Sequence, residues 1–343
     1  MTKIITFYNN KGGVSKTTTL FNLAVYLTQK DNKRILIADC DPQCNATELF
    51  FASNESAQDP DSELPGTSIY EALRPRFSGE VRQIDPKTIT LTESSLYKNL
   101  WLLKGDLEFS LAENYLARAA IEAITEDIHQ KNTYVAVYQL LHGLGDTHSF
   151  DYILCDVGPS TGAITRAVVL ACDGYFLPLT PDRFCNQAVR VLGRVLNEWI
   201  RKHSDISKAF SPYKLKSFPG KPRLLGAVMQ NFKIHSAAKA KESYIKWQDQ
   251  IKETIESTLL AESNVPVSET LSPKQPFVAN IRDVGTLAPV AQMFGRAIFD
   301  VRRQDTSEAS TTGEPYGGVV WQGWQKRMKE YQKEIKHMAE ALP

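Results

Sequence analysis

The sequence predicts an α/β protein with a doubly wound, mostly parallel sheet, helices on both faces, and a helical appendage at the C-terminal end. Short apolar runs alternate with longer amphipathic stretches, a pattern typical of parallel strands that are covered on both faces. A glycine-containing turn with lysines and threonines joins the first apolar run to the first amphipathic stretch. Aspartates stand at the ends of two other runs.

The N-terminal part of the chain begins this alternation. The first predicted strand, 4–8, reads Ile-Ile-Thr-Phe-Tyr, and a helix is predicted over 17–29 after the turn. The strand predicted over 34–39 is apolar through its middle and ends in a carboxylate. Residues 54–66 are acidic and contain Pro60 and Pro65, so we expect a surface loop there.

The alternation continues through the rest of the chain. Further strands are predicted where four to seven mostly apolar residues are bounded by polar or turn-forming ones. A strong helix is predicted over 185–201, because apolar residues recur there every three or four positions. The further strands span 99–103, 152–156, 175–179 and 224–230.

Composition excludes several classes of protein. The chain has 343 residues, of which 42% are hydrophobic and 23% charged, as in ordinary globular proteins. Its net charge of +1 excludes a uniformly basic nucleic-acid protein. No apolar run approaches the roughly 18 residues of a membrane span, and the N-terminal residues lack a signal-peptide pattern. The five scattered cysteines indicate reduced core residues, so we expect a cytoplasmic protein.

The length fits two domains or one large α/β domain, and the pattern favours one domain over 1–302. Residues 303–318 are rich in Ser, Thr, Gly and acidic side chains and are predicted to be a linker. The last segment, 319–343, is predicted to be an amphipathic helix. Its apolar stripe consists of Trp321, Trp324, Met328, Tyr331, Ile335, Met338 and Leu342.

A phosphate-binding loop is predicted between the first strand and the first helix. Residues 9–19 read Asn-Asn-Lys-Gly-Gly-Val-Ser-Lys-Thr-Thr-Thr, and such loops require a strand before them and a helix after them. Glycines allow the backbone N–H groups to approach phosphate oxygens, and the helix N-terminus adds partial positive charge. Lys16 would reach the β and γ phosphates, Thr17 the Mg²⁺ ion, and Thr18 the α phosphate. The predicted nucleotide-binding residues are Gly12, Gly13, Val14, Ser15, Lys16, Thr17 and Thr18.

Three carboxylates are expected close to this loop. Asp39 and Asp156 end predicted strands and Asp41 follows closely. In an open α/β sheet, ligands gather at the carboxyl ends of the strands. A single aspartate after a strand is often only a helix cap, but three of them behind a phosphate loop favour a magnesium nucleotide site.

The loop resembles the deviant Walker A motif, K-G-G-x-x-K-[ST], of the ParA/MinD family of ATPases, and is closest to the ParA/Soj-type partition proteins. The segment 39–47, Asp-Cys-Asp-Pro-Gln-Cys-Asn-Ala-Thr, resembles the family element D-x-D-P-Q-x-N-A-T. The resemblance covers about residues 1–300 and implies a P-loop ATPase fold. Ser15 replaces a glycine usual in the family, and it costs about 1 kcal/mol if the position needs a positive φ.

The resemblance also implies roles for individual residues. Lys11 reaches the phosphates of the partner subunit across a nucleotide-sandwich dimer, and it forms the catalytic set with Lys16 and Asp41. By the resemblance, Asp41 would position or activate the attacking water. Asp39 and Asp156, with Thr17, support the Mg²⁺ ion. Near the adenine, the resemblance implies contacts from Pro181 and from Gln230 or Asn231, although strands that end in Pro or Asn are common.

Basic residues gather in one part of the nearly neutral chain. Between Arg190 and Lys252 there are 14 Lys or Arg residues against four acidic ones, so this segment carries +10. On the helix over 185–201, a solvated face opposite the apolar one is predicted from the spacings 4, 3 and 4 of Arg190, Arg194, Asn197 and Arg201. Such a face suits phosphate contacts without base reading. An ordinary solvated face is the alternative. The candidate DNA contacts are Arg190, Arg194, Arg201 and Lys202.

The function predicted from these features is a ParA-like ATPase. ATP and Mg²⁺ would build a homodimer, and the dimer would bind nonspecific DNA and associate with the nucleoid. A ParB-like or cargo adaptor would stimulate the slow hydrolysis of ATP. The cycle would position or segregate DNA or another cargo. One alternative is a MinD-like membrane-surface switch that uses the C-terminal helix, although packing of that helix on the body or on a partner is favoured over lipid. A regulatory ATPase of another machine is a second alternative. An electron-transfer ATPase is disfavoured, because the cysteines lack a cluster-binding pattern.

Overall fold

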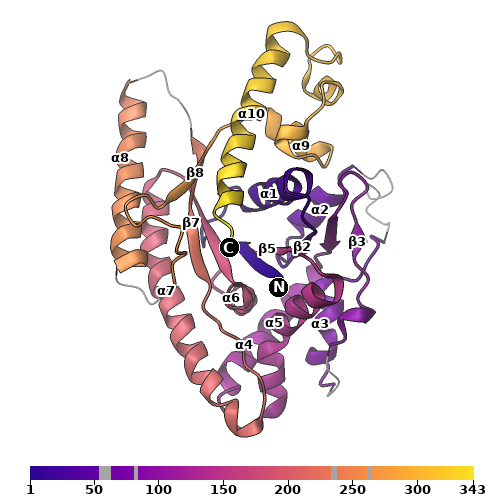
Figure 1. Ribbon diagram of the computed structural model, residues 1–343, viewed down its shortest axis with the longest axis vertical. Helices are drawn as coiled ribbons and strands as arrows, with labels where there is room; N and C mark the ends of the chain where they lie inside the picture. Colours follow the sequence, from indigo (N-terminus) through magenta and orange to yellow (C-terminus); the bar gives the residue numbers. More distant parts are fainter. Residues whose placement is uncertain (54–62, 81–83, 233–237, 262–264) are drawn as a thin grey trace.

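An eight-stranded sheet forms the centre of the computed structural model, with strand order β3-β4-β2-β5-β1-β6-β7-β8 (Figure 1). The structure describes residues 1–53, 63–80, 84–232, 238–261 and 265–343. All neighbouring strands pair in parallel except β3 and β4, which are antiparallel. The strands are β1 (Lys3–Phe7), β2 (Ile35–Asp39), β3 (Thr92–Glu93), β4 (Leu100–Leu103), β5 (Tyr152–Asp156), β6 (Gly174–Leu179), β7 (Arg223–Phe232) and β8 (Phe277–Arg282).

The predicted fold class is therefore confirmed, and the six predicted strands are confirmed to within two residues. β3 and β8 were not predicted, because β3 is only a two-residue strand and β8 mixes apolar with polar residues. Both lie at an edge of the sheet, where a strand needs an apolar side chain on one face only. Part of the loop predicted over 54–66 lies outside the described residues, and 63–66 contain no helix or strand.

Helices cover both faces of the sheet, and successive strand residues point to opposite faces. Ile4 and Leu36 join one apolar core, while Ile5 and Ile37 join the other. The core that contains Ile5 is covered by α1 (Lys16–Lys30), α2 (Asn45–Phe51), α9 (Leu287–Met293) and α10 (Gly318–Glu340). The opposite core is covered by α3 (Ile69–Phe77), α4 (Ala112–Glu122), α5 (Ile128–His148), α6 (Ala163–Ala171), α7 (Arg183–Lys208) and α8 (Ala238–Ile255).

Helix α7 extends seven residues beyond its predicted end at Arg201. The polar run after Arg201 suggested a helix end. The structure instead buries His203, whose ring nitrogens lie 2.9 Å from the Tyr134 hydroxyl and 2.8 Å from the Phe218 carbonyl oxygen. Ile206 is also buried, so the apolar stripe continues for another turn. α7 lies beside α8 at one side of the molecule (Figure 1).

The C-terminal helix α10 packs on the body of the protein rather than standing apart from it (Figure 1). It lies against α1 and β8, and Glu334 accepts a hydrogen bond from the backbone N–H of Asn280 at 2.7 Å. The helix thus covers the edge strand, which would otherwise expose unpaired backbone groups. The linker predicted over 303–318 contains a 3₁₀ segment at Gln304–Ala309. Its predicted role as a separator does not fit this packing.

The apolar stripe of α10 faces the protein core. Trp324, Tyr331, Ile335 and Met338 are at most 4% exposed. In this arrangement the stripe is not available to a lipid surface. Among the described helices, none is long and apolar enough to cross a membrane.

Replacing Ile335 with alanine should lower the free energy of unfolding by about 3 kcal/mol, because the substitution removes a fully buried side chain and leaves a cavity. Val319, on the first turn of the same helix, is 84% exposed, and Val319→Ala should change stability by less than about 0.5 kcal/mol. Chemical denaturation of the two variants measures both effects. Equal stability of the two variants would show that α10 is not packed on the sheet in solution.

Candidate functional site

The sheet order brings the predicted site residues to one edge. β2, β5 and β1 are consecutive strands, and their carboxyl ends carry Asp39, Asp156 and the phosphate loop. In the β2–β5 ladder, Asp39 is directly opposite Asp156. The site is therefore fixed by backbone pairing of strands that lie more than 100 residues apart in the sequence.

The phosphate loop contains a strained position, as the sequence suggested. Ser15 has φ 54° and ψ 32°, which is the left-handed region, and it directly precedes α1. Its side chain makes no capping hydrogen bond, so the strain of about 1 kcal/mol is not offset locally. Gly13 also has a positive φ, of 73°. This backbone turns the chain sharply from β1 into α1.

Asn9 fixes the start of the loop, a role that sequence reasoning missed. Its side-chain amide donates to the Pro178 carbonyl oxygen at 2.7 Å, and its side-chain oxygen accepts from the backbone N–H of Lys11 at 3.0 Å. Asn9 is buried just after β1, and its bond to Pro178 is shielded from water. The loop is thereby tied to the neighbouring strand β6. A polar residue directly after an apolar strand was the available signal.

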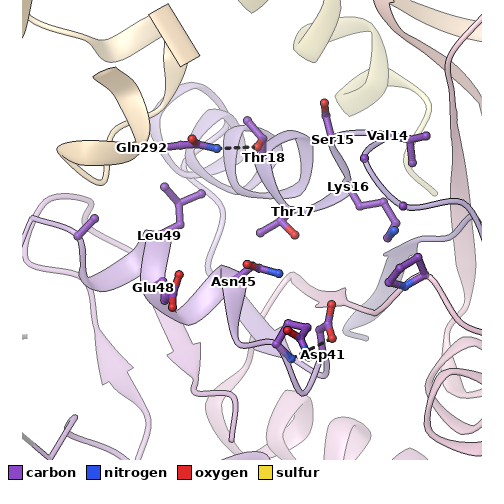
Figure 2. Close-up of a pocket in the computed structure, with 15 residues that line it drawn as sticks. Val14, Ser15, Lys16, Thr17, Thr18, Asp41, Asn45, Glu48, Leu49 and Gln292 are labelled. Carbon is purple, nitrogen blue, oxygen red and sulfur yellow. Dashed lines mark hydrogen bonds between the residues drawn. The ribbon is translucent and has the colours of Figure 1, made fainter. Parts of the chain in front are cut away.

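The loop borders a cavity of about 640 Å³ (Figure 2). The side chains of Lys16, Thr17 and Asp41 surround its central space, while α2 and Gln292 of α9 form the opposite wall (Figure 2). The volume is in the range of small-molecule sites. The lining residues are Gly12–Thr18, Asp41, Gln43, Asn45, Glu48, Leu49, Ala52, Pro159 and Gln292.

Thr17 and Asp156 meet at the floor of the site. The Thr17 hydroxyl donates to Asp156 Oδ2 at 2.6 Å, while Asp156 Oδ1 is buried with no hydrogen-bond partner among the described residues. Asp39 accepts from the backbone N–H and the hydroxyl of Thr47, at 2.8 and 2.7 Å. Asp41 accepts from the backbone N–H of Gln43 at 3.0 Å. Carboxylate and hydroxyl oxygens such as these are the ligands that Mg²⁺ prefers.

Burial makes Asp156 and Asp39 reluctant to ionise. It raises the pKa of Asp156 to about 8, with a further contribution from the charge of Asp39. Burial also raises the pKa of Asp39, to about 6, against hydrogen bonds from Thr47 that lower it. Burial lowers the pKa of Lys16, which the charges of Asp156 and Asp41 oppose. A divalent cation would stabilise the ionised carboxylates.

The donor set fits Mg²⁺ held together with a nucleotide. Within the described ranges there is no group of three or more His, Cys, Asp or Glu side chains that could cage a metal. Mg²⁺ is commonly bound by one or two carboxylates, waters and substrate phosphates instead. The orphaned Asp156 oxygen and the Thr17 hydroxyl supply protein oxygens for that arrangement.

The chain is similar to known proteins along much of its length. It is 28% identical over 205 residues to the sporulation initiation inhibitor protein Soj of Bacillus subtilis, covering 59% of this chain and 68% of Soj. The crystal structure of DIP2308 from Corynebacterium diphtheriae is similar with a TM-score of 0.59 at 26% identity, covering 74% and 88% of the two chains. A family model described as an AAA domain, AAA_31, matches residues 2–208.

The protein belongs to the ParA-type P-loop ATPases. This family assignment agrees with the resemblance found in its phosphate loop. The fold of nearly the whole chain is similar to that of an aspartate-to-alanine variant of Cyanothece McdA in complex with ATP. The TM-score is 0.62 at 16% identity, and the similarity covers 99% of this chain and 96% of that one. At that identity the likeness concerns the fold alone.

Lys11 of this ParA-type ATPase does not line the cavity wall. Its ammonium lies 2.6 Å from Asp182 Oδ2 and 3.1 Å from the Thr180 hydroxyl, at the junction between β6 and α7. The lysine that the resemblance assigns to the partner's phosphates is therefore bound within its own subunit. The sequence did not single out Asp182, because it lies 171 positions from Lys11.

Pro181 and Gln230, two of the residues expected near the adenine, are not on the wall of this cavity. Pro181 lies beside Asp182 at the β6–α7 junction, and the buried Gln230 amide donates to the Thr19 hydroxyl at 2.8 Å. Asn231 belongs to β7, but its side chain lies outside the described part of the structure. Their contact with the base stays a prediction. Gln292, which lies 3.4 Å from the Thr18 hydroxyl, is a lining residue that the sequence did not single out.

The candidate DNA contacts lie on the exposed side of α7, but they are not equivalent. Arg190 and Arg194 are exposed and form no ion pair with the described residues. Arg201 lies 3.9 Å from Asp205, and Lys202 lies 2.6 Å from Glu198. The charges of Arg201 and Lys202 are thus partly neutralised by carboxylates on the same helix. Arg190 and Arg194 are therefore the stronger candidates.

Replacing Asp156 with asparagine should raise the stability of the nucleotide-free protein, by an amount that grows as the pH rises from about 4 to about 8. Folding raises the pKa of this acid, so its penalty is absent below about pH 4 and grows as the pH rises to about 8. The variant should therefore show a weaker loss of stability over this range. It should also lose the stabilisation that Mg²⁺ adds in the presence of an ATP analogue.

Thermal denaturation across pH, with and without Mg²⁺, measures both effects. Asp31→Asn removes one negative charge at the exposed end of α1 and is the matched control. The two variants behaving alike would contradict the assignment of Asp156 to the metal site.

Proposed function

We propose that this ParA-type ATPase forms an ATP-dependent dimer that binds DNA nonspecifically and positions or segregates DNA or another cargo, in association with the nucleoid. A ParB-like or cargo adaptor would stimulate an otherwise slow hydrolysis. The observation that carries the proposal is the meeting of the phosphate loop with Asp41 at one cavity, where Thr17 of the loop also bonds to Asp156. The exposed arginine face of α7 supports the DNA step.

ATP and Mg²⁺ are the cofactors for which the site residues have matching chemistry. Mg²⁺ would neutralise phosphate charge and orient the β and γ phosphates. Lys16 extends into the cavity and would hold the same oxygens as a point charge (Figure 2). Asp41, which lines the same cavity, would orient the attacking water. Such catalysis consists mostly of positioning and electrostatic stabilisation.

We propose dimerisation because the cavity wall lacks the second lysine that the phosphate-loop motif leads us to expect. Lys11 is present but bound to Asp182, so it would complete a partner's site only after moving. Two large apolar side chains near the site are exposed, Phe184 at 69% and Met293 at 55%. A second copy of the chain that covers this face would bury them, which favours association.

Lys16→Ala and Asp41→Ala should have different effects on the reaction. Removing Lys16 takes a charge from the phosphate cradle, so ATP affinity should fall by at least about tenfold. Removing Asp41 should leave ATP binding intact, lower turnover by about a hundredfold, and retain the ATP dimer. Fluorescent-nucleotide binding, phosphate release and light scattering measure these three properties.

Lys30→Ala, at the exposed end of α1, is the control and should change none of these properties. Unchanged affinity and turnover in Lys16→Ala would refute the nucleotide site. An Asp41→Ala protein that stays monomeric with ATP at all concentrations would count against the dimer.

Arg190→Glu combined with Arg194→Glu should abolish binding to random duplex DNA and leave ATP-driven dimerisation intact. The two exposed arginines would contact phosphates, and such contacts release counterions, so binding by the unaltered protein should weaken steeply with salt. Lys326→Glu combined with Lys329→Glu changes the net charge equally on the exposed face of α10 and is the matched control. Fluorescence anisotropy with random DNA over a range of salt concentrations measures the effect. Equal losses in the two double variants would mean that net charge, rather than the α7 face, governs binding.

The alternative functions differ from this proposal in what the ATP dimer binds. A membrane-surface switch would need the apolar stripe of α10, but that stripe is buried against the sheet. A regulatory ATPase of another machine would use the same nucleotide switch without DNA. Retardation of random DNA by the ATP-bound wild-type protein therefore separates the proposed function from both alternatives.

A further inference from the structure

The contact between Lys11 and Asp182 is the most specific interaction at the site that nucleotide binding does not explain. The ammonium lies 2.6 Å from the carboxylate, and the two side chains are 29% and 37% exposed. The Thr180 hydroxyl contacts both partners, at 3.1 Å from Lys11 and 2.5 Å from Asp182. Three side chains thus form one hydrogen-bonded group at the end of β6.

The two oxygens of Asp182 have separate partners. Oδ1 accepts from the backbone N–H of Cys185 at 2.9 Å, which caps the N-terminus of α7. Oδ2 faces Lys11 and Thr180. Burial alone would raise the pKa of Asp182, but the bonds from Lys11 and Thr180 hold it below its ordinary value. The carboxylate is therefore ionised at neutral pH, and its attraction for Lys11 is that of a full charge.

The phosphate loop is otherwise tied to the same region of the protein. Asn9 bonds to Pro178 on β6, and Tyr8 stacks on Trp199 of α7 with ring centroids 5.7 Å apart. The backbone of Lys11 is also held, through the Asn9 side chain. Release of the Lys11 side chain therefore needs rotation of the side chain alone. The loop that carries it can stay in place.

We propose that Asp182 is a positioning residue that holds Lys11 within its own subunit until a partner's phosphates compete for it, and so sets the concentration at which the ATP dimer forms. This inference rests on the proposed function. One ammonium group cannot contact Asp182 and a phosphate of another subunit at once. Dimerisation must therefore break two such ion pairs, one in each subunit, before either lysine completes the opposite site.

Asp182→Asn tests this role with little change of shape. Asparagine caps helices as well as aspartate does, so its oxygen keeps the bond to the Cys185 N–H, while the charge that holds Lys11 is lost. Asp127→Asn is the matched control. Asp127 caps α5 in the same way, through the N–H of Gln130 at 3.1 Å, and forms no ion pair with Lys11.

The first measurement is the labelling rate of Lys11 by an amine-reactive reagent in nucleotide-free protein, followed by peptide mass spectrometry. Asp182→Asn should speed the labelling of Lys11 several-fold, and Asp127→Asn should not. In the unaltered protein, added salt should also speed Lys11 labelling relative to the exposed Lys30, since salt screens an exposed ion pair. That second comparison needs no variant.

The second measurement is dimerisation with a nonhydrolysable ATP analogue and Mg²⁺, by analytical ultracentrifugation. Exposed ion pairs are individually weak, and two are broken per dimer, so Asp182→Asn should lower the dimer dissociation constant about tenfold. Asp127→Asn should leave the dissociation constant unchanged.

Faster labelling with tighter dimerisation in Asp182→Asn alone supports the role. Equal labelling of Lys11 in Asp182→Asn and wild type, with no salt effect, overturns it, as does faster labelling with unchanged or weaker dimerisation. In either case the wild-type dimer still forms and the proposed function stands. Absence of an ATP-dependent dimer in all three proteins overturns the proposed dimer itself, together with the role of Asp182 in it.

Discussion

The pairing of Asp39 with Asp156 across neighbouring buried strands is the constraint on which the site depends. Two carboxylates that are both nearly inaccessible to solvent stand opposite each other in the β2–β5 ladder. Their burial and mutual repulsion oppose ionisation, and the pKa values of both are raised as a result. Hydrogen bonds from Thr47 and Thr17 offset part of this penalty. Neutral residues at this edge would make a protein without a ligand more stable, so the buried carboxylates support the proposed cation site.

The same edge of the sheet holds strain in its backbone. Ser15 adopts a left-handed conformation immediately before α1, where glycine would be unstrained. The surrounding contacts hold it there, because Asn9 ties the loop to β6 and Gln292 of α9 lies close to Thr18. Buried charge and backbone strain therefore coincide in a few residues, while the two apolar cores on either side of the sheet supply the stability.

The sequence predicted the parts of this structure that depend on local pattern. Apolar runs located the central strands, and the Lys-Gly-Gly-Val-Ser-Lys run located the turn into α1, because both are specified within about ten residues. The positive φ of Ser15 could be predicted because the family usually has a glycine at this position. The ion pair between Lys11 and Asp182 could not be predicted in this way. Asp182 lies 171 positions from Lys11, and only the pairing of β1 with β6 brings the two residues together. Gln292 and the covering of β8 by α10 depend on long-range packing for the same reason.

Charge placement links the nucleotide site to the surface of α7. The basic excess in 190–252 indicated a cationic region, but only the structure separates Arg201 and Lys202, which face Asp205 and Glu198, from Arg190 and Arg194. These two arginines lie two and three turns from the helix N-terminus that Asp182 caps. The helix that presents Arg190 and Arg194 to solvent thus begins next to the residue that binds Lys11, and Trp199 of the same helix packs on Tyr8 at the start of the phosphate loop. The proposed rearrangement of Lys11 would therefore take place at one end of the element that carries the proposed DNA contacts.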